Sequence, residues 1–251
     1  MHGEKLHQRI DHIFMDLFPA GAIREERIAL SHRLLDAMPD GKITLCDAGT
    51  GIGKTYACLA AAFVYLRHRS SIGKKFRPLI ISTSSIAFQT ELHKSYIPQL
   101  AEILSQDGRE IDLNALSVIR KGKSHYVCDK QLEWRLKQMS KRPSKQKDGL
   151  KRLLMEVDMD EAGHIRSYDR KLLQVPRVCH CDRTRCRYLD FLDDCDATPY
   201  LFRICNHNLL LADAIRRSLG YRPIFPDNCA VIIRKRRWAR LSRTCRKGSA
   251  I

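Results

Sequence analysis

The chain has 251 residues, which is enough for one large domain or two small ones with a sizeable core. Its hydrophobic fraction of 44% is ordinary, and no apolar run approaches the roughly 20 residues that span a bilayer, so we expect a cytoplasmic protein without a membrane segment or a secretory signal. The formal net charge of +17 favours a polyanionic partner, for which nucleic acid is the commonest candidate.

Hydrophobic periodicity separates helices from strands along the chain. Helices are predicted over residues 3–17, 24–38, 55–66 and 86–104. Short apolar runs predict buried strands over residues 43–46, 78–82, 116–119, 201–205 and 229–233. Residues 129–175 are charged and mostly helical in propensity. Short apolar strands alternating with helices indicate an α/β fold, with a parallel sheet covered by helices on both faces.

A glycine-rich segment, DAGTGIGKT, begins at Asp47, directly after a predicted strand and before a predicted helix. This is the context of a phosphate-binding loop, or P-loop, whose backbone N–H groups surround phosphate oxygens. Lys54 is placed to reach the β- and γ-phosphates of ATP, and the Thr55 hydroxyl to bind Mg²⁺, so both are candidate catalytic residues. The candidate nucleotide-binding residues are Ala48, Gly49, Thr50, Gly51, Ile52, Gly53, Lys54 and Thr55.

Four of the ten cysteines fall between Cys179 and Cys195. Clustered cysteines in a reducing compartment indicate a metal or an iron–sulfur cluster rather than disulfides. Four thiolates suit a [4Fe–4S] cluster and also suit structural zinc. The candidate ligands are Cys128, Cys179, Cys181, Cys186 and Cys195.

Two further segments carry weaker signals. The segment KGKSHYVC, residues 121–128, places basic residues beside Tyr126, a combination that can contact single-stranded DNA. The segment NHN, residues 206–208, follows a predicted strand, where α/β proteins often bind ligands. The residue types alone favour a simpler role for Asn206 or Asn208 as a helix N-cap.

These segments occur in an order that resembles the DinG-like and XPD-like iron–sulfur DNA helicases of superfamily 2. AGTGIGKT resembles their ATP-binding loop, LIISTSSIAFQTEL a DNA-contacting motif, KGKSHYVC the segment of the first cluster cysteine, and FRICNHNLLLADA the segment after the last one. The resemblance covers residues 15–233. It implies a RecA-like P-loop NTPase domain over residues 1–120 and 201–233, interrupted by a helical iron–sulfur insertion at 121–200. It also implies ATP, Mg²⁺ and 5′-to-3′ movement on single-stranded or forked DNA by a monomer.

The resemblance selects Cys128, Cys179, Cys181 and Cys186 as cluster ligands, with Cys195 as an alternative to Cys179. The sequence also departs from the family pattern. Arg27 stands where the family usually has a glutamine that reads adenine.

The second departure follows the strand at residues 229–233, which leads into Arg234–Arg237 where the family has Asp-Glu-Ala-His. We therefore expect an incomplete motor domain, and residues 234–251 to be an out-of-frame ending; a basic DNA-binding tail is the rival interpretation. We expect a helicase by descent that binds ATP without hydrolysing it alone. The alternative is a non-enzymatic module for nucleotide or single-stranded DNA. A small P-loop kinase is disfavoured by the cysteine cluster.

Overall fold

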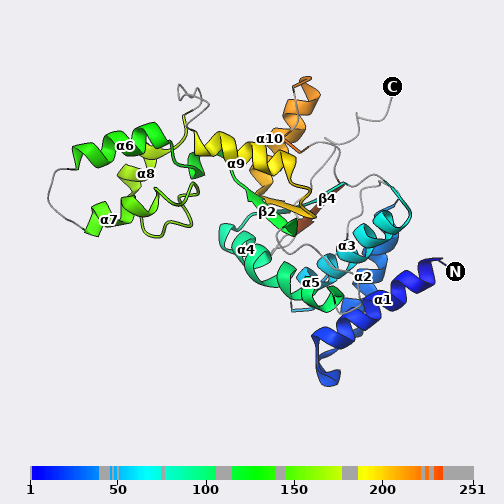
Figure 1. The fold of residues 1–251 in the computed structure, drawn as a ribbon. Coiled ribbons are helices and arrows are strands. Elements are labelled where there is room, and N and C mark those ends of the chain that lie inside the picture. Colours follow the sequence, from blue (N-terminus) through cyan, green and yellow to red (C-terminus); the bar gives the residue numbers. More distant parts are fainter. Residues whose placement is uncertain are drawn as a thin grey trace.

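The computed structural model describes residues 2–39, 46, 48–49, 51–74, 77–105, 115–139, 145–176, 186–221, 224–225 and 229–233. At its centre lies a four-stranded sheet in the order β2-β3-β1-β4, and every pairing is parallel (Figure 1). The strands are β1 Leu79–Thr83, β2 Ser117–Arg120, β3 Phe202–Cys205 and β4 Cys229–Ile233. The predicted parallel sheet is confirmed for these strands. Of the strand expected over residues 43–46, only Cys46 is described, and it is not in a strand.

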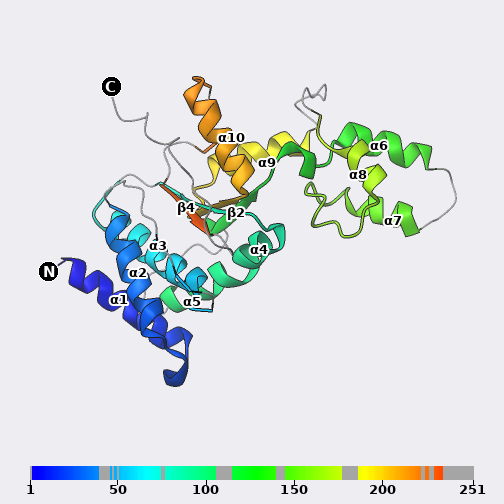
Figure 2. The same ribbon diagram turned by 180° about the vertical axis from the view of Figure 1, so that it is seen from behind.

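Helices cover both faces of this sheet (Figures 1 and 2). The layer on one face contains α1 His2–Leu17, α2 Glu25–Ala37, α3 Lys54–Ser71, α4 Ile86–Glu91 and α5 Ile97–Ser105. The other face is covered by α9 Arg187–Ala197 and α10 His207–Ser218. None of the helices in the described ranges combines the length and apolar character that a membrane crossing demands.

Successive side chains of each strand point to opposite faces of the sheet, so the strands contribute to two separate apolar clusters. Leu79, Ile81 and Phe202 point into the larger core, where the ring of Phe202 packs edge-on against Phe63 of α3 at 4.8 Å. Ile80 points the other way and packs with residues of the α10 region. Every residue of β1 and β3 is buried, including Arg203 of β3, which explains why apolar residues occur on both faces of these strands rather than in alternation.

The helix predicted over residues 86–104 is broken into α4 and α5 by a π-helical turn, η2 Leu92–Tyr96. Pro98 lies two residues after that turn and has no backbone N–H to continue the hydrogen-bond pattern. The N–H of Ile97 reaches back to the Leu92 carbonyl instead, which is the wider spacing of a π-helix.

The middle of the chain forms a helical lobe beside the sheet (Figures 1 and 2). Its helices are α6 Asp129–Gln138, α7 Lys145–Arg152 and α8 Ser167–Leu173, so the charged stretch 129–175 is less continuously helical than predicted. The lobe has its own apolar cluster, which includes Val127, Leu132 and Leu153. The described residues also include two short 3-10 helices, η1 Ala20–Ala22 and η4 Lys123–His125.

Candidate nucleotide-binding site

The P-loop leads directly into α3, which begins at Lys54 with Gly53 as its N-cap. Gly51 and Gly53 have φ values of +83° and +90°, a region that side-chain-bearing residues rarely adopt. These two glycines turn the backbone towards the start of α3, where free N–H groups and the helix dipole favour an anion. Asp47 and Thr50 lie outside the described residues.

Lys54 folds back over the loop that precedes it. Its ammonium group donates hydrogen bonds to the carbonyl oxygens of Ala48 and Gly49, the latter at 2.9 Å. Thr55 follows it in the first turn of α3 and is half-buried. The loop therefore places a positive charge and a hydroxyl group together at one helix N-terminus, the combination that a magnesium–nucleotide complex requires.

Two arginines from the start of α2 hold the loop from the other side. Arg24 donates from Nη1 to the carbonyl oxygen of Gly51 at 2.8 Å. Arg27 donates from Nε to the carbonyl oxygen of Ile52 at 2.9 Å. Arg27, which stands where the resembled family usually has a glutamine, therefore supports the P-loop.

Arg27 is enclosed, with only 7% of its surface exposed. Its guanidinium carbon lies 4.1 Å from the centroid of the Phe18 ring, a close cation–π contact. Burial and the nearby Arg24 lower the pKa of Arg27, but an arginine remains charged at neutral pH. A Cβ atom added to Gly53 would lie 2.5 Å from Arg27 Nε, so this position requires glycine for space as well as for its positive φ.

Sequence analysis did not identify Phe18 or Ser31 as part of this region. Ser31 donates from Oγ to the carbonyl oxygen of Ala57 at 2.7 Å and ties α2 to α3 behind the loop. For Ser31, the sequence offers one clue: it lies seven residues after Arg24 and four after Arg27, so all three residues fall on one face of a helix.

The carboxyl edge of the sheet brings two of the helicase-like segments together. His207 at the start of α10 shares a 2.8 Å hydrogen bond through Nδ1 with Ser82 Oγ of β1. Asn206 accepts from the backbone N–H of Leu209 at 2.7 Å, so the N-cap favoured from sequence is confirmed. Ser85 caps α4 in the same way. Polar side chains of β1, α4 and α10 therefore meet at one edge.

The basic segment at 121–128 is not available to a DNA strand in the way that the sequence suggested. The Lys121 side chain is 2% exposed, and its ammonium lies 2.5 Å from Asp158 and 2.9 Å from Asp160. Tyr126 is buried, and its hydroxyl accepts a hydrogen bond from the Lys121 backbone. The prediction of single-strand contact was wrong for these two residues because both serve to join the lobe to β2.

Two of the candidate cluster ligands pack together. Cys128 and Cys186 are buried in one small group with Tyr126, Val175 and Tyr188. The residues that follow them are also joined, since Arg187 donates from its backbone N–H and Nε to the carboxylate of Asp129. Cys179 and Cys181 lie outside the described residues, and within the described ranges no three His, Cys, Asp or Glu side chains form a group that could hold a metal ion.

Cys195 lies elsewhere on the same helix. It is nine residues after Cys186, which corresponds to about 13.5 Å along α9 at 1.5 Å per residue. Its carbonyl oxygen accepts a hydrogen bond from Arg203 of β3 at 2.8 Å, and burial raises the pKa of its thiol to about 11. The thiol is therefore neutral at pH 7.

Comparison with known proteins gives partial matches to helicases, and no family model matches the chain. It is 33% identical over 110 residues to the ATP-dependent DNA helicase YoaA of Escherichia coli (strain K12), covering 44% of this chain and 15% of that protein. It is 30% identical over 134 residues to the probable ATP-dependent helicase YpvA of Bacillus subtilis (strain 168), covering 52% and 19%. A third match, 26% over 113 residues, is the 3'-5' exonuclease DinG of Bacillus subtilis, covering 45% and 11%.

The chain spans less than a fifth of the length of these curated relatives. The matched stretch accounts for about half of this chain, and the relatives that it matches are enzymes by name. The parallel α/β sheet and the P-loop that opens α3 agree with that relationship. Over its matched residues, the chain is a relative of the ATP-dependent helicases of the DinG type.

Proposed function

We propose that this chain binds ATP with Mg²⁺ at residues 48–55, as the nucleotide-binding part of a DinG-type DNA helicase. The observation that carries the proposal is the loop before α3, with Gly51 and Gly53 at positive φ and Lys54 folded over the loop carbonyls. In this proposal Lys54 moves from those carbonyls to the β- and γ-phosphates, and the Thr55 hydroxyl holds Mg²⁺. Backbone N–H groups of the loop bind the remaining phosphate oxygens.

We propose that residues 1–251 alone bind ATP without appreciable turnover. Hydrolysis needs acidic residues that hold the metal ion and orient water. The sequence after β4 is Arg234-Lys235-Arg236-Arg237, and residues 234–251 contain no Asp or Glu. The same basic sequence favours the second candidate function, a non-enzymatic module that binds nucleotide and single-stranded DNA.

The proposal also covers the direction of movement along DNA and the kind of DNA that is bound. From the resemblance to the DinG-like and XPD-like helicases, we propose movement 5′-to-3′ on single-stranded or forked DNA. The charge of +17 supports a nucleic-acid partner in general, because it attracts the phosphate backbone.

We further propose that Cys128, Cys179, Cys181 and Cys186 hold a [4Fe–4S] cluster, which would anchor the lobe structurally. The common burial of Cys128 and Cys186 supports this set, as does the ion pair between the residues that follow them. Cys195 is a poor substitute because its distance from Cys186 along α9 is larger than one cluster can bridge.

Calorimetric titration of the 251-residue chain with MgATP tests the nucleotide proposal. We expect saturable binding by the natural chain and a loss of at least tenfold in affinity for Lys54→Ala, with Lys94→Ala as a control because Lys94 is an exposed lysine on η2. A parallel measurement of phosphate release with single-stranded DNA present distinguishes the two candidate functions. Absence of MgATP binding would refute both the site and the function, whereas robust DNA-stimulated turnover would refute only the proposal of binding without hydrolysis.

A further inference from the structure

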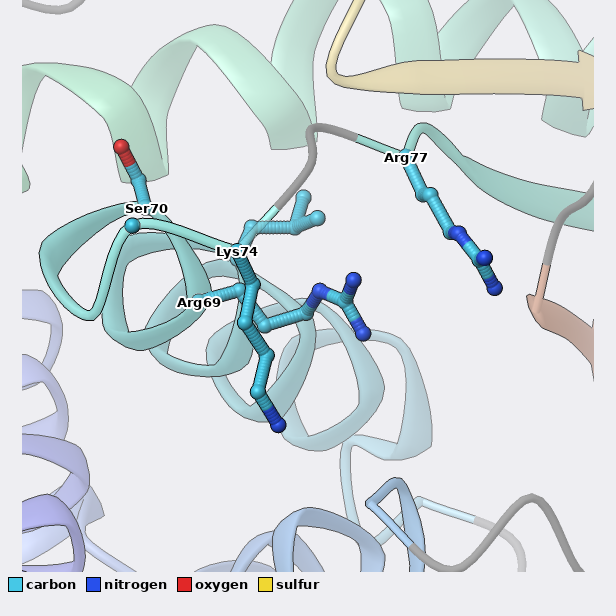
Figure 3. Close-up of a pocket in the computed structure, with 6 residues that line it drawn as sticks. Arg69, Ser70, Lys74 and Arg77 are labelled. Carbon is cyan, nitrogen blue, oxygen red and sulfur yellow. The ribbon is translucent and has the colours of Figure 1, made fainter.

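A second cationic feature lies at the far end of α3 from the P-loop. The helix has 18 residues and ends at Ser71, about 25 Å along its axis from Lys54 at 1.5 Å per residue. A hollow of about 160 Å³ lies there, between the end of α3 and the start of β1 (Figure 3). The residues that line it are Leu66, Arg69, Ser70, Gly73, Lys74 and Arg77. We call this feature the α3 basic hollow.

The α3 basic hollow contains three cations and no carboxylate among its lining residues. Figure 3 shows the side chains of Arg69, Lys74 and Arg77 extending to the same side of the connection between α3 and β1. The neighbouring sequence supplies no acidic residue either, because residues 48–90 contain no Asp or Glu. A concentration of one sign of charge at a hollow attracts ions of the opposite sign.

The dipole of α3 does not account for this charge. The carboxyl end of a helix carries about half of a negative elementary charge, and cations near it are stabilising. One lysine or arginine is enough to balance that partial charge. The three cations that line the α3 basic hollow carry more positive charge than this partial charge can balance.

The exposure of the three side chains indicates what kind of anion fits. Arg69 is half-buried and held in place, since it donates to the Tyr65 hydroxyl at 3.2 Å and lies 5.7 Å from the centroid of that ring. Lys74 and Arg77 are exposed. A site for a free small molecule encloses most of its ligand, whereas backbone phosphates of a nucleic acid are bound by exposed Lys and Arg side chains.

We propose that the α3 basic hollow binds backbone phosphates of a nucleic acid strand, at a contact separate from the nucleotide site. The inference rests on the proposed function only in taking DNA as the partner. It adds a surface at the amino-terminal edge of the sheet, where β1 begins, opposite the edge at which Ser82 and His207 meet.

The test is the salt dependence of single-stranded DNA binding by the full chain, measured by fluorescence anisotropy with a labelled oligonucleotide. The variant is Lys74→Gln with Arg77→Gln, two exposed positions where folding is preserved. The matched control is Lys5→Gln with Arg9→Gln, which removes the same two charges from exposed positions on α1. MgATP affinity and thermal unfolding are measured for all three proteins.

Each phosphate contact with a single strand contributes about 0.7 to the slope of log affinity against log salt concentration. We therefore expect the hollow variant to flatten the slope by about 1.4 and to weaken binding roughly 25-fold at 0.1 M salt, which is about fivefold per contact. The control keeps the natural slope to within about 0.3, and all three proteins bind MgATP equally.

Equal slopes for the hollow variant and the control would overturn the inference and leave the proposed function standing. The same conclusion follows if the variant loses binding to phosphatidylserine vesicles while its DNA slope is unchanged, because the anion would then be a lipid headgroup. If the natural chain binds no DNA at any salt concentration, both the inference and the DNA part of the proposed function fail.

Discussion

Arg27→Ala is the substitution that tests the structure of the nucleotide-binding site most directly. Arg27 donates to the Ile52 carbonyl at 2.9 Å and packs against the Phe18 ring at 4.1 Å, with 7% of its surface exposed. Its Nη1 atom is buried without a hydrogen-bond partner among the described residues. The Arg27 side chain therefore stabilises the folded protein through two contacts, and destabilises it through the desolvation of the unpaired Nη1 atom.

The magnitude follows from these three contributions. A hydrogen bond from a charged group contributes about 1.5–3 kcal/mol, and a desolvated cation–π contact about 2 kcal/mol. Removing the unpaired Nη1 recovers about 1–3 kcal/mol of desolvation energy. The balance is a loss of about 2 kcal/mol in the free energy of unfolding, which lowers the Tm of a chain of this size by about 4–8 °C.

Differential scanning calorimetry measures this change, and Arg24→Ala is the matched control. Arg24 makes the same kind of bond to the neighbouring carbonyl of Gly51, but it is exposed, so its removal costs about 0.5 kcal/mol or less. Amide exchange at residues 51–53 should accelerate in Arg27→Ala more than in Arg24→Ala. Equal Tm values for the natural chain and Arg27→Ala, or equal losses in both variants, would refute the assignment of Arg27 as the support of the loop.

Other predictions concern the cysteines and the junction of the lobe. Cys186→Ser should abolish the iron content and the absorbance near ~400 nm of anaerobically purified protein, whereas Cys195→Ser, at another buried thiol, should leave both unchanged; loss of iron in Cys195→Ser would instead make Cys195 a ligand in place of Cys179. Burial opposes ionisation of Asp160, but hydrogen bonds from His125 and Lys121 outweigh it and lower its pKa. Asp160→Asn should therefore destabilise the protein above about pH 5, and the difference from the natural chain should shrink as the pH falls below the ordinary Asp value of 3.8, which pH-dependent urea unfolding measures. An unchanging difference between pH 7 and pH 3 would contradict that role for Asp160.

The parts of the fold that were predictable from sequence are those set by local pattern. β1 and β3 are short, mostly apolar segments, so the sequence marks them as buried parallel strands within one residue of their observed bounds. The P-loop is equally local, because its glycines and Lys54 are adjacent in the chain. The break between α4 and α5 was missed although Pro98 signals it, since the apolar spacing continues through the π-helical turn.

The contacts that decide the character of the site are long-range, and no local pattern predicts them. Arg27 is 25 residues from the carbonyl that it supports, and from sequence it was notable only for standing where the resembled family usually has an adenine-reading glutamine. Lys121 lies 39 residues from Asp160, and from sequence it looked like a basic residue open to DNA. In both cases burial reversed the expected role, because a charge taken out of water has to be paired within the protein.

The two proposed sites lie at opposite ends of α3, and the helix dipole makes them physically different. At the amino end, the dipole and Lys54 both favour phosphate, so few cations suffice and backbone N–H groups supply most of the contacts. At the carboxyl end, the dipole opposes an anion, so binding there depends on Arg69, Lys74 and Arg77 outweighing it. Nucleotide binding should consequently depend on loop geometry and respond weakly to salt, whereas DNA binding at the α3 basic hollow should depend on side-chain charge and respond strongly. A single protein titrated with both ligands over the same salt range therefore distinguishes the two ends of one helix.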